Sequence, residues 1–215
     1  MPIDLGEMFQ SGVAVVTVEC QRGVIGPKGP LPALVEAVRE SGMVEKSARV
    51  LEAAREQGAP VLHGTVVRRP DGGGVKVNCR LFAVTAKSPT SLLEGTESAR
   101  VVEAFGPGEL DYEIPRRHGV SLFHDTELDS ILRSLGVETI VLLGVSLNIA
   151  IIGTTIEAIN RGYQVVIPED GVVATPADYG KAMLDNSLRM LATITTCGSV
   201  EQALRSRGPR GSTNP

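Results

Sequence analysis

The sequence predicts a single α/β domain, a three-layer α/β/α sandwich on a doubly wound, mostly parallel sheet. The strongest indication is residues 137–170, where the β-branched run Thr139–Leu143 ends at Gly144. A helix-spaced apolar pattern follows, and Tyr163–Pro168 returns as a second apolar strand. Strand, helix and strand in this order form the unit of a parallel sheet. Aromatic residues make up only 3% of the 215 residues, so the core must be aliphatic, as in strands buried on both faces.

The rest of the chain alternates in the same way. We expect strands at Val13–Glu19, Pro60–Val67 and, at an edge, Thr193–Thr196, and helices at Pro32–Arg39, Glu45–Gln57, Leu128–Gly136 and Pro176–Thr193. Arg68–Gly74 is expected as a polar turn, residues 75–95 as irregular with some helix, and Arg116–Phe123 as a loop. Residues 1–204 should form the domain, and the polar, Gly- and Pro-containing end 205–215 a disordered tail.

Composition and charge exclude several classes of protein. The net charge is −4 and no basic tract occurs, which argues against a nucleic-acid partner. No apolar run is long enough to span a bilayer, so we expect no membrane association, and the acidic N-terminus does not resemble a signal peptide. The three cysteines, Cys20, Cys79 and Cys197, lie far apart in the chain. Their odd number and spacing favour reduced thiols and a cytoplasmic location.

The site should lie beyond the C-terminal ends of the strands, where doubly wound sheets bind their ligands. Three strand ends carry polar residues: Glu19-Cys20-Gln21, His63-Gly64-Thr65 and Gly144-Val145-Ser146. The loop with Arg117 and His118 comes before the helix that leads into the third of these strands. It could therefore reach the same crevice.

Three motifs in this order resemble the isochorismatase-like superfamily of cysteine hydrolases. Val15–Gln21 has the form of its first strand, with Glu19 where the family has Asp. In the segment 117–128, Arg117 stands where the family has Lys, six residues before Phe123. In Gly144–Ala150, which leads into a Thr-Ile-Glu-Ala helix, Ala150 stands where the family has its cysteine nucleophile. The resemblance covers residues 12–197, with all three catalytic positions substituted.

This resemblance implies a Rossmann-like sandwich with a cis peptide bond between Val145 and Ser146. It also implies backbone N–H groups of the Ser146–Ala150 turn that face an oxyanion. In the family, the Asp and Lys activate the Cys for attack on a carbonyl or nitrile carbon. Some isochorismatases lack the Cys and use the Asp as a general acid, so Ala150 alone does not exclude hydrolysis. The resemblance further implies a homodimer or homotetramer, and we expect no cofactor.

The sequence therefore predicts a hydrolase that acts on a small, anionic molecule without a cysteine nucleophile. Glu19 would be the acid or base, Arg117 would hold negative charge, and the Ser146–Ala150 amides would bind an oxyanion or carboxylate. The remaining expected substrate contacts are Val145, Ser146, Asn148 and His118. Two alternatives stay open: a catalytically silent subunit that binds a small ligand or serves in assembly, and a cysteine amidohydrolase in which residue 150 has been changed to Ala.

Several of these residues also allow a purely structural interpretation. Glu19 and Arg117 could form an internal ion pair, and a fixed cation there should lower the pKa of Glu19. Asn148 could cap the helix, and Cys20 should face the core, opposite Glu19, as an inert thiol.

The remaining charged residues and the histidines suggest no more specific site. Arg68 and Arg69 could select an anion or simply lie in a solvated turn. The three histidines, His63, His118 and His124, lack the spacing of a zinc site, so we expect no catalytic metal.

Overall fold

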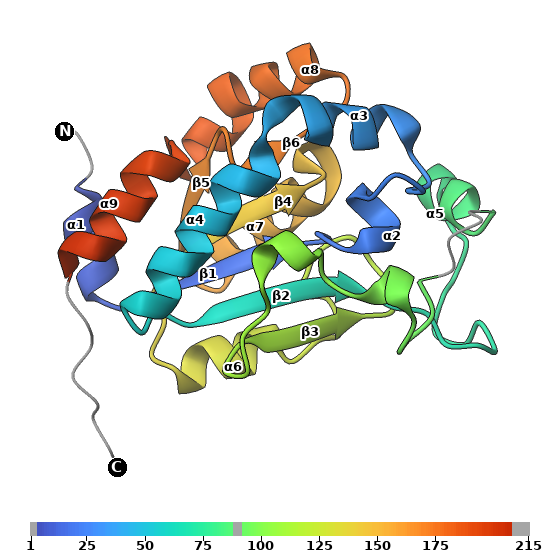
Figure 1. The fold of residues 1–215 in the computed structure, drawn as a ribbon, viewed down its shortest axis with the longest axis horizontal. Helices are drawn as coiled ribbons and strands as arrows, with labels where there is room; N and C mark the ends of the chain where they lie inside the picture. Colours follow the sequence, from blue (N-terminus) through green and yellow to red (C-terminus); the bar gives the residue numbers. More distant parts are fainter. Residues whose placement is uncertain (1–3, 88–91, 208–215) are drawn as a thin grey trace.

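The protein forms a three-layer sandwich, in which a parallel sheet lies between two layers of helices (Figure 1). The computed structural model describes residues 4–87 and 92–207. Within these residues the strands of the seven-stranded sheet are β1 (Val13–Val18), β2 (Val61–Val66), β3 (Tyr112–Arg116), β4 (Thr139–Val145), β5 (Gln164–Pro168), β6 (Val172–Val173) and β7 (Thr193–Thr195). Their order is β3-β2-β1-β4-β5-β7, with β6 beside β4, and every pair is parallel.

The helices cover both faces of the sheet. The α-helices are α1 (Leu5–Gln10), α2 (Arg22–Ile25), α3 (Pro32–Ser41), α4 (Met43–Glu56), α5 (Arg80–Thr85), α6 (Leu128–Ser134), α7 (Ile152–Asn160), α8 (Ala177–Ala182) and α9 (Cys197–Arg207). Helices α1, α3, α4 and α9 pack on one face of the sheet, and α6, α7 and the segment after α8 pack on the other.

The core confirms the expected two-sided burial of the strands. All six residues of β1 are buried. Val13 and Val15 join the apolar cluster beneath α4 and α9, whereas Ala14, Val16 and Val18 join the cluster beneath α6 and α7. A strand that is buried on both faces is apolar at nearly every position. The one polar residue of β1, Thr17, is buried with its hydroxyl 2.8 Å from the His63 Nδ1.

Several elements differ from the sequence-based expectation, among them the short helix α2, which lies where a loop was expected. Strand β3 was not predicted, because it contains a proline and buries only Ile114 and Arg116. The short β6 and the helix α1 were also missed. The expected helix Pro176–Thr193 is not uniform, since a π-helical turn (Met183–Ser187) and a 3-10 turn (Leu188–Met190) follow α8.

Helix α9 lies partly in the segment that was expected to be a tail. It extends to Arg207 and buries Leu204 against the core, so the boundary expected at residue 205 is wrong by three residues. The remainder of the expected tail, 208–215, lies outside the described residues.

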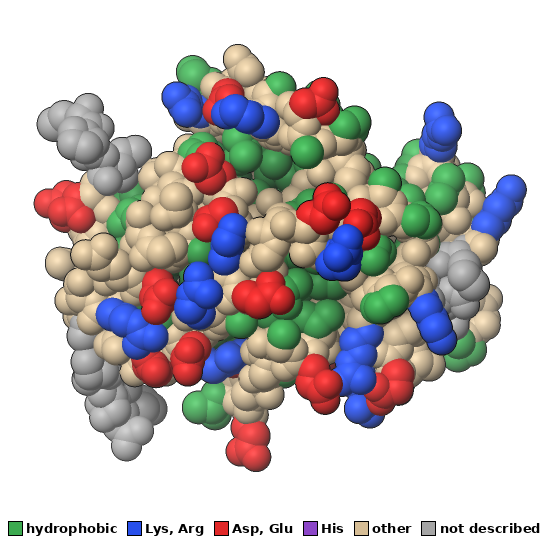
Figure 2. All heavy atoms as spheres, turned by 45° about the horizontal axis from the view of Figure 1, so that its top comes forward, with side chains coloured by type: hydrophobic (Ala, Val, Ile, Leu, Met, Phe, Trp, Pro, Cys, Tyr) green, Lys and Arg blue, Asp and Glu red, His purple; other side chains and the backbone are tan. Residues whose placement is uncertain are grey.

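The surface shows no single-sign patch on the face that carries α4. Acidic and basic side chains are interspersed there (Figure 2), in part as ion pairs such as Arg205 with Glu56 and Arg49 with Glu201. Among the described helices, none has the length and apolar character needed to cross a membrane.

Candidate active site

The candidate site lies where the chain connections of the sheet reverse direction, between β1 and β4. From β1 the strand order continues to β2 and β3 on one side, and from β4 to β5 and β7 on the other. At the ends of the two strands, Val18 is paired with Gly144. A side chain at Gly144 would place its Cβ 2.4 Å from the Val18 carbonyl oxygen, so only glycine fits. This close approach puts the residues that follow, Glu19 and Ser146, at the same edge of the sheet.

Glu19 is held in an unusual conformation at the end of β1. Its φ angle is 55°, in the left-handed region that residues with a side chain seldom adopt. Its backbone N–H donates to the carbonyl of Gly64 at 2.8 Å. Backbone strain of this kind concentrates at functional sites.

The carboxylate of Glu19 forms an ion pair with Arg116, the last residue of β3. The Arg116 side chain is 4% exposed and that of Glu19 is 19% exposed. The guanidinium of Arg116 also donates to the Gly119 carbonyl, while its Nε has no partner in the described part of the chain. The ion pair therefore leaves the buried Nε–H donor of Arg116 without an acceptor among the described residues.

Arg117, which the sequence offered either as an anion holder or as a partner of Glu19, forms no ion pair with Glu19 in the described structure. It pairs instead with Glu94 at 3.1 Å, and both side chains are largely exposed, at 43% and 54%. The physical reason is strand alternation. Arg116 shares a face of β3 with the buried Ile114, whereas Arg117 lies beyond the strand and turns toward solvent. Arg117 does line the pocket, but it does not form the internal ion pair with Glu19 that the sequence left open.

Burial raises the pKa of Glu19 above the usual range of a glutamate, while the charge and hydrogen bond of Arg116 offset part of the rise. We expected a neighbouring arginine to lower this pKa. Arg116 does lower it, as expected, but removing the carboxylate from water outweighs the attraction of the cation, and the net shift is upward.

The turn after β4 forms another wall of the pocket. The peptide bond between Val145 and Ser146 is cis, and a π-helical turn, Leu147–Ile151, leads directly into α7. Ser146 and Ala150 line the pocket. Val145 is instead fully buried in the core.

Asn148 neither caps the helix nor lines the pocket. Its side-chain N–H donates to the Thr175 carbonyl at 3.5 Å, and its Oδ1 has no partner among the described residues. Asn148 is therefore not placed as the expected helix cap, and it is not among the residues that line the pocket.

His118 lies on the pocket wall, as expected. Its ring is 5.0 Å from the ring of Phe82 and 6.0 Å from that of His124, centroid to centroid. Its Nδ1 is buried and has no partner within the described residues.

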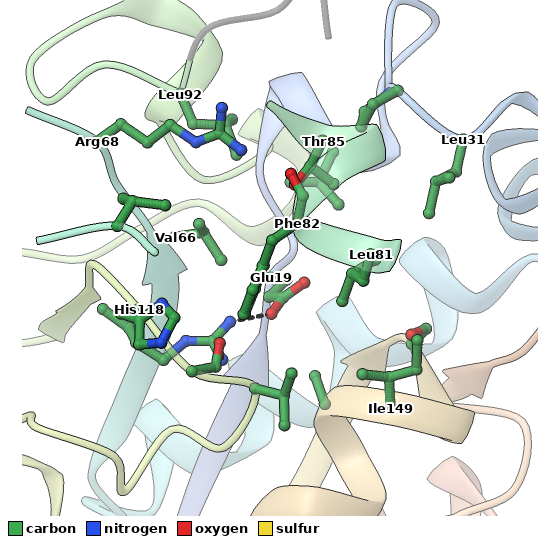
Figure 3. Close-up of a pocket in the computed structure, with 18 of the residues that line it drawn as sticks. Glu19, Leu31, Val66, Arg68, Leu81, Phe82, Thr85, Leu92, His118 and Ile149 are labelled. Carbon is green, nitrogen blue, oxygen red and sulfur yellow. Dashed lines mark hydrogen bonds and ion pairs between the residues drawn. The ribbon is translucent and has the colours of Figure 1, made fainter. Parts of the chain in front are cut away.

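Apolar side chains of α5 cover one side of the pocket, and they were not predicted from the sequence. Leu81 and Phe82 reach into the pocket from α5, and Leu31 and Ile149 close its other side (Figure 3). In the figure, Phe82 extends from α5 toward Glu19 and its dashed contact. The signal in the sequence was the apolar segment 81–84, which is too short to show a helical period.

No cysteine lies on the pocket wall in the described part of the chain. Cys20 is 1% exposed and packs in the core cluster beneath α4, which confirms that it turns away from Glu19. Burial and the nearby Glu19 charge raise the pKa of the Cys20 thiol far above its usual value. Cys79 is exposed and Cys197 is buried. None of the three is placed to act as the nucleophile.

His63 belongs to a different part of the molecule. Its Nδ1 is 2.8 Å from the Thr17 hydroxyl and its Nε2 is 3.1 Å from the Asp111 carboxylate, so both ring nitrogens are occupied. Across the described residues, no three or more His, Cys, Asp or Glu side chains are grouped so that they could hold a metal ion.

Comparison with known proteins agrees with this fold. The isochorismatase domain model matches residues 13–199. A maleamate amidohydrolase from Pseudomonas putida is 27% identical, over 89% of this chain and 86% of its own. A ureidoacrylate amidohydrolase from Methylobacterium radiotolerans is 28% identical, over 92% of this chain and 82% of its own. Among solved structures, a cysteine hydrolase from Pseudomonas syringae pv. phaseolicola superimposes with a TM-score of 0.79 at 23% identity, covering 96% of both chains.

Proposed function

Because the chain belongs to the isochorismatase family, we propose that it hydrolyses the amide bond of a small molecule without a cysteine nucleophile. The observation that carries this proposal is the buried Glu19–Arg116 pair on the wall of a pocket where no thiol is present among the described residues. The names of two relatives, both amidohydrolases, favour an amide over other hydrolysable groups.

Glu19 acts first as a general base. Its carboxylate takes a proton from a water molecule, whose oxygen forms a bond to the carbonyl carbon of the substrate. The negative charge that develops on the carbonyl oxygen is stabilised by N–H groups of the Ser146–Ala150 turn other than that of Ile149, which already donates to the Ser146 carbonyl at 3.1 Å. The proton then passes from Glu19 to the leaving nitrogen as the C–N bond breaks. The products are a carboxylic acid and ammonia or an amine.

The environment of Glu19 suits both halves of this cycle. A carboxyl group whose pKa is raised by burial is a stronger base when ionised and donates its proton more readily in a later step at higher pH than an ordinary glutamate does. Arg116 holds the carboxylate in place but cannot exchange a proton, because a guanidinium remains charged. Arg117, paired with Glu94 at the pocket mouth, has no part in the reaction.

The alternative is a catalytically silent protein that binds a small ligand in the same pocket. Two observations favour it: Ala150 has no reactive atom, and Glu19 is already engaged by Arg116. Under this alternative the pocket is unchanged but no bond is broken.

A panel assay separates the two functions. Purified protein is incubated with small amides, ureido compounds and isochorismate, and release of ammonia, amine or acid is followed for the wild type, Glu19→Gln and the control Glu94→Gln. We expect turnover of at least one amide, abolished by Glu19→Gln and retained by Glu94→Gln. If Glu19→Gln turns over as fast as the wild type, the mechanism is wrong. If nothing is turned over while small carboxylates raise the melting temperature, the binding function replaces it.

A further inference from the structure

Four arginines lie at or near the pocket, and they differ in how their charge is neutralised. Three have acidic partners: Arg69 with Asp71, Arg116 with Glu19 and Arg117 with Glu94. For Arg68, which lines the pocket, the described part of the chain contains no ion pair or side-chain hydrogen bond. Arg68 is therefore the one cation of this group whose charge has no counterpart within the described residues.

The backbone holds Arg68 in place. Its N–H donates to the Leu92 carbonyl at 2.7 Å, and its own carbonyl accepts from the N–H of Glu94 at 3.1 Å. The side chain is half-buried and lies beside Leu92, at the end of the pocket away from Glu19 (Figure 3). Partial burial of a cation without a partner is unfavourable, and an anionic group of a ligand would remove that cost.

The wall between the two ends of the pocket is apolar. It is formed by Val66 of β2, Leu81 and Phe82 of α5, and Leu92. Arg68 lies four residues beyond Gly64, whose carbonyl accepts the N–H of Glu19. Because an extended chain rises about 3.3 Å per residue, the backbones of Gly64 and Arg68 lie roughly 13 Å apart. This distance does not include the length of the side chains that extend into the pocket. A ligand that contacts both ends therefore needs a hydrocarbon segment of medium length.

We propose that the pocket binds the monoamide of a medium-chain dicarboxylic acid. The amide carbonyl lies against Glu19 and the Ser146–Ala150 turn, the hydrocarbon chain lies along Phe82, and the free carboxylate pairs with Arg68. The orientation of the amide end rests on the proposed function. The carboxylate site and the apolar wall do not, so they can be tested by binding alone.

The test compares Arg68→Met with Arg69→Met, a neighbouring arginine that pairs with Asp71 in solvent. Methionine keeps an apolar stem in place of the arginine stem. The probe is the methyl-ketone analogue of suberic acid monoamide, in which carbon replaces the amide nitrogen so that hydrolysis cannot occur. Two further probes are the corresponding analogue of succinic acid monoamide, with a shorter chain, and the neutral methyl ketone that lacks the carboxylate. Affinity is measured by calorimetry and by the shift in melting temperature.

We expect the long keto acid to bind the wild type and Arg69→Met equally, and Arg68→Met about tenfold or more weakly, since a charge-assisted hydrogen bond is lost. The neutral ketone should not distinguish the three proteins, and the short keto acid should bind weakly to all of them. Equal binding of the long keto acid to Arg68→Met and wild type would overturn the assignment, as would equal binding of the short one. If the binding pattern is as expected but suberic acid monoamide is not hydrolysed, the ligand assignment stands and the hydrolytic function fails.

Discussion

Replacing Arg116 and Arg117 separately by methionine tests the central feature of the site, which is that Glu19 pairs with the first of these arginines and not with the second. The two substitutions are chemically identical and adjacent in the chain. Both preserve an apolar side-chain stem. They differ in the environment of the carboxylate that loses its partner. Arg116 is 4% exposed and its partner Glu19 is 19% exposed, whereas Arg117 and its partner Glu94 are both largely in solvent.

Removing one partner of a buried ion pair costs about 3–5 kcal/mol, since the other charge stays buried without compensation. Glu19 retains some contact with water, so we take the lower end, about 3 kcal/mol. For a domain of this size that corresponds to a fall in melting temperature of roughly 6–12 °C. An exposed pair contributes at most about 1 kcal/mol, so Arg117→Met should stay within a few degrees of the wild type.

Urea unfolding followed by circular dichroism measures both free energies of unfolding. The pH dependence of turnover supplies a second measurement that a general loss of packing would not change. Without Arg116 the pKa of Glu19 should rise further, and the acid limb of the rate profile should move to higher pH, whereas Arg117→Met should leave it in place. Equal destabilisation by the two substitutions, or a larger effect of Arg117→Met, would refute the pairing described here.

Three further predictions concern pH, thiols and assembly. Because burial raises the pKa of Glu19 in the folded state, its contribution to stability is fully present below the unfolded value of about 4.3 and is lost as the pH rises through the folded pKa. The wild type should therefore lose stability relative to Glu19→Gln over that window in urea titrations, and a pH-independent difference would contradict the raised pKa. Alkylation with iodoacetamide should leave turnover unchanged, since only Cys79 is exposed, and loss of wild-type activity would show that a native thiol takes part. Introducing a thiol by Ala150→Cys should make any new amidase activity sensitive to the same reagent. By family resemblance, light scattering at micromolar protein should give the mass of a dimer or tetramer, and a monomer mass would contradict this.

The fold class and part of the site could be predicted from the sequence, because both depend on local patterns. Continuous aliphatic runs predict strands buried on both faces, and polar residues directly after such strands indicate the edge where ligands bind. Glu19 and the turn from Ser146 to Ala150 were predicted to lie at this edge, and Glu19, Ser146 and Ala150 line one pocket there. The inward orientation of Cys20 follows from strand alternation alone.

The ion pair and the apolar side of the pocket were decided only by the tertiary structure. The pairing of Glu19 with Arg116 depends on which face of β3 each arginine occupies. That strand buries too few residues to be recognised in the sequence. The approach of Leu81 and Phe82 depends on where a short helix, without buried residues of its own, is placed by the chain around it. That Arg68 has no ion-pair partner among the described residues likewise emerges only when the neighbouring carboxylates have been assigned their partners in space. Local sequence determines which residues can form strands and turns, but charge pairing and pocket walls are contacts between distant segments, and they exist only once the sheet has fixed its register.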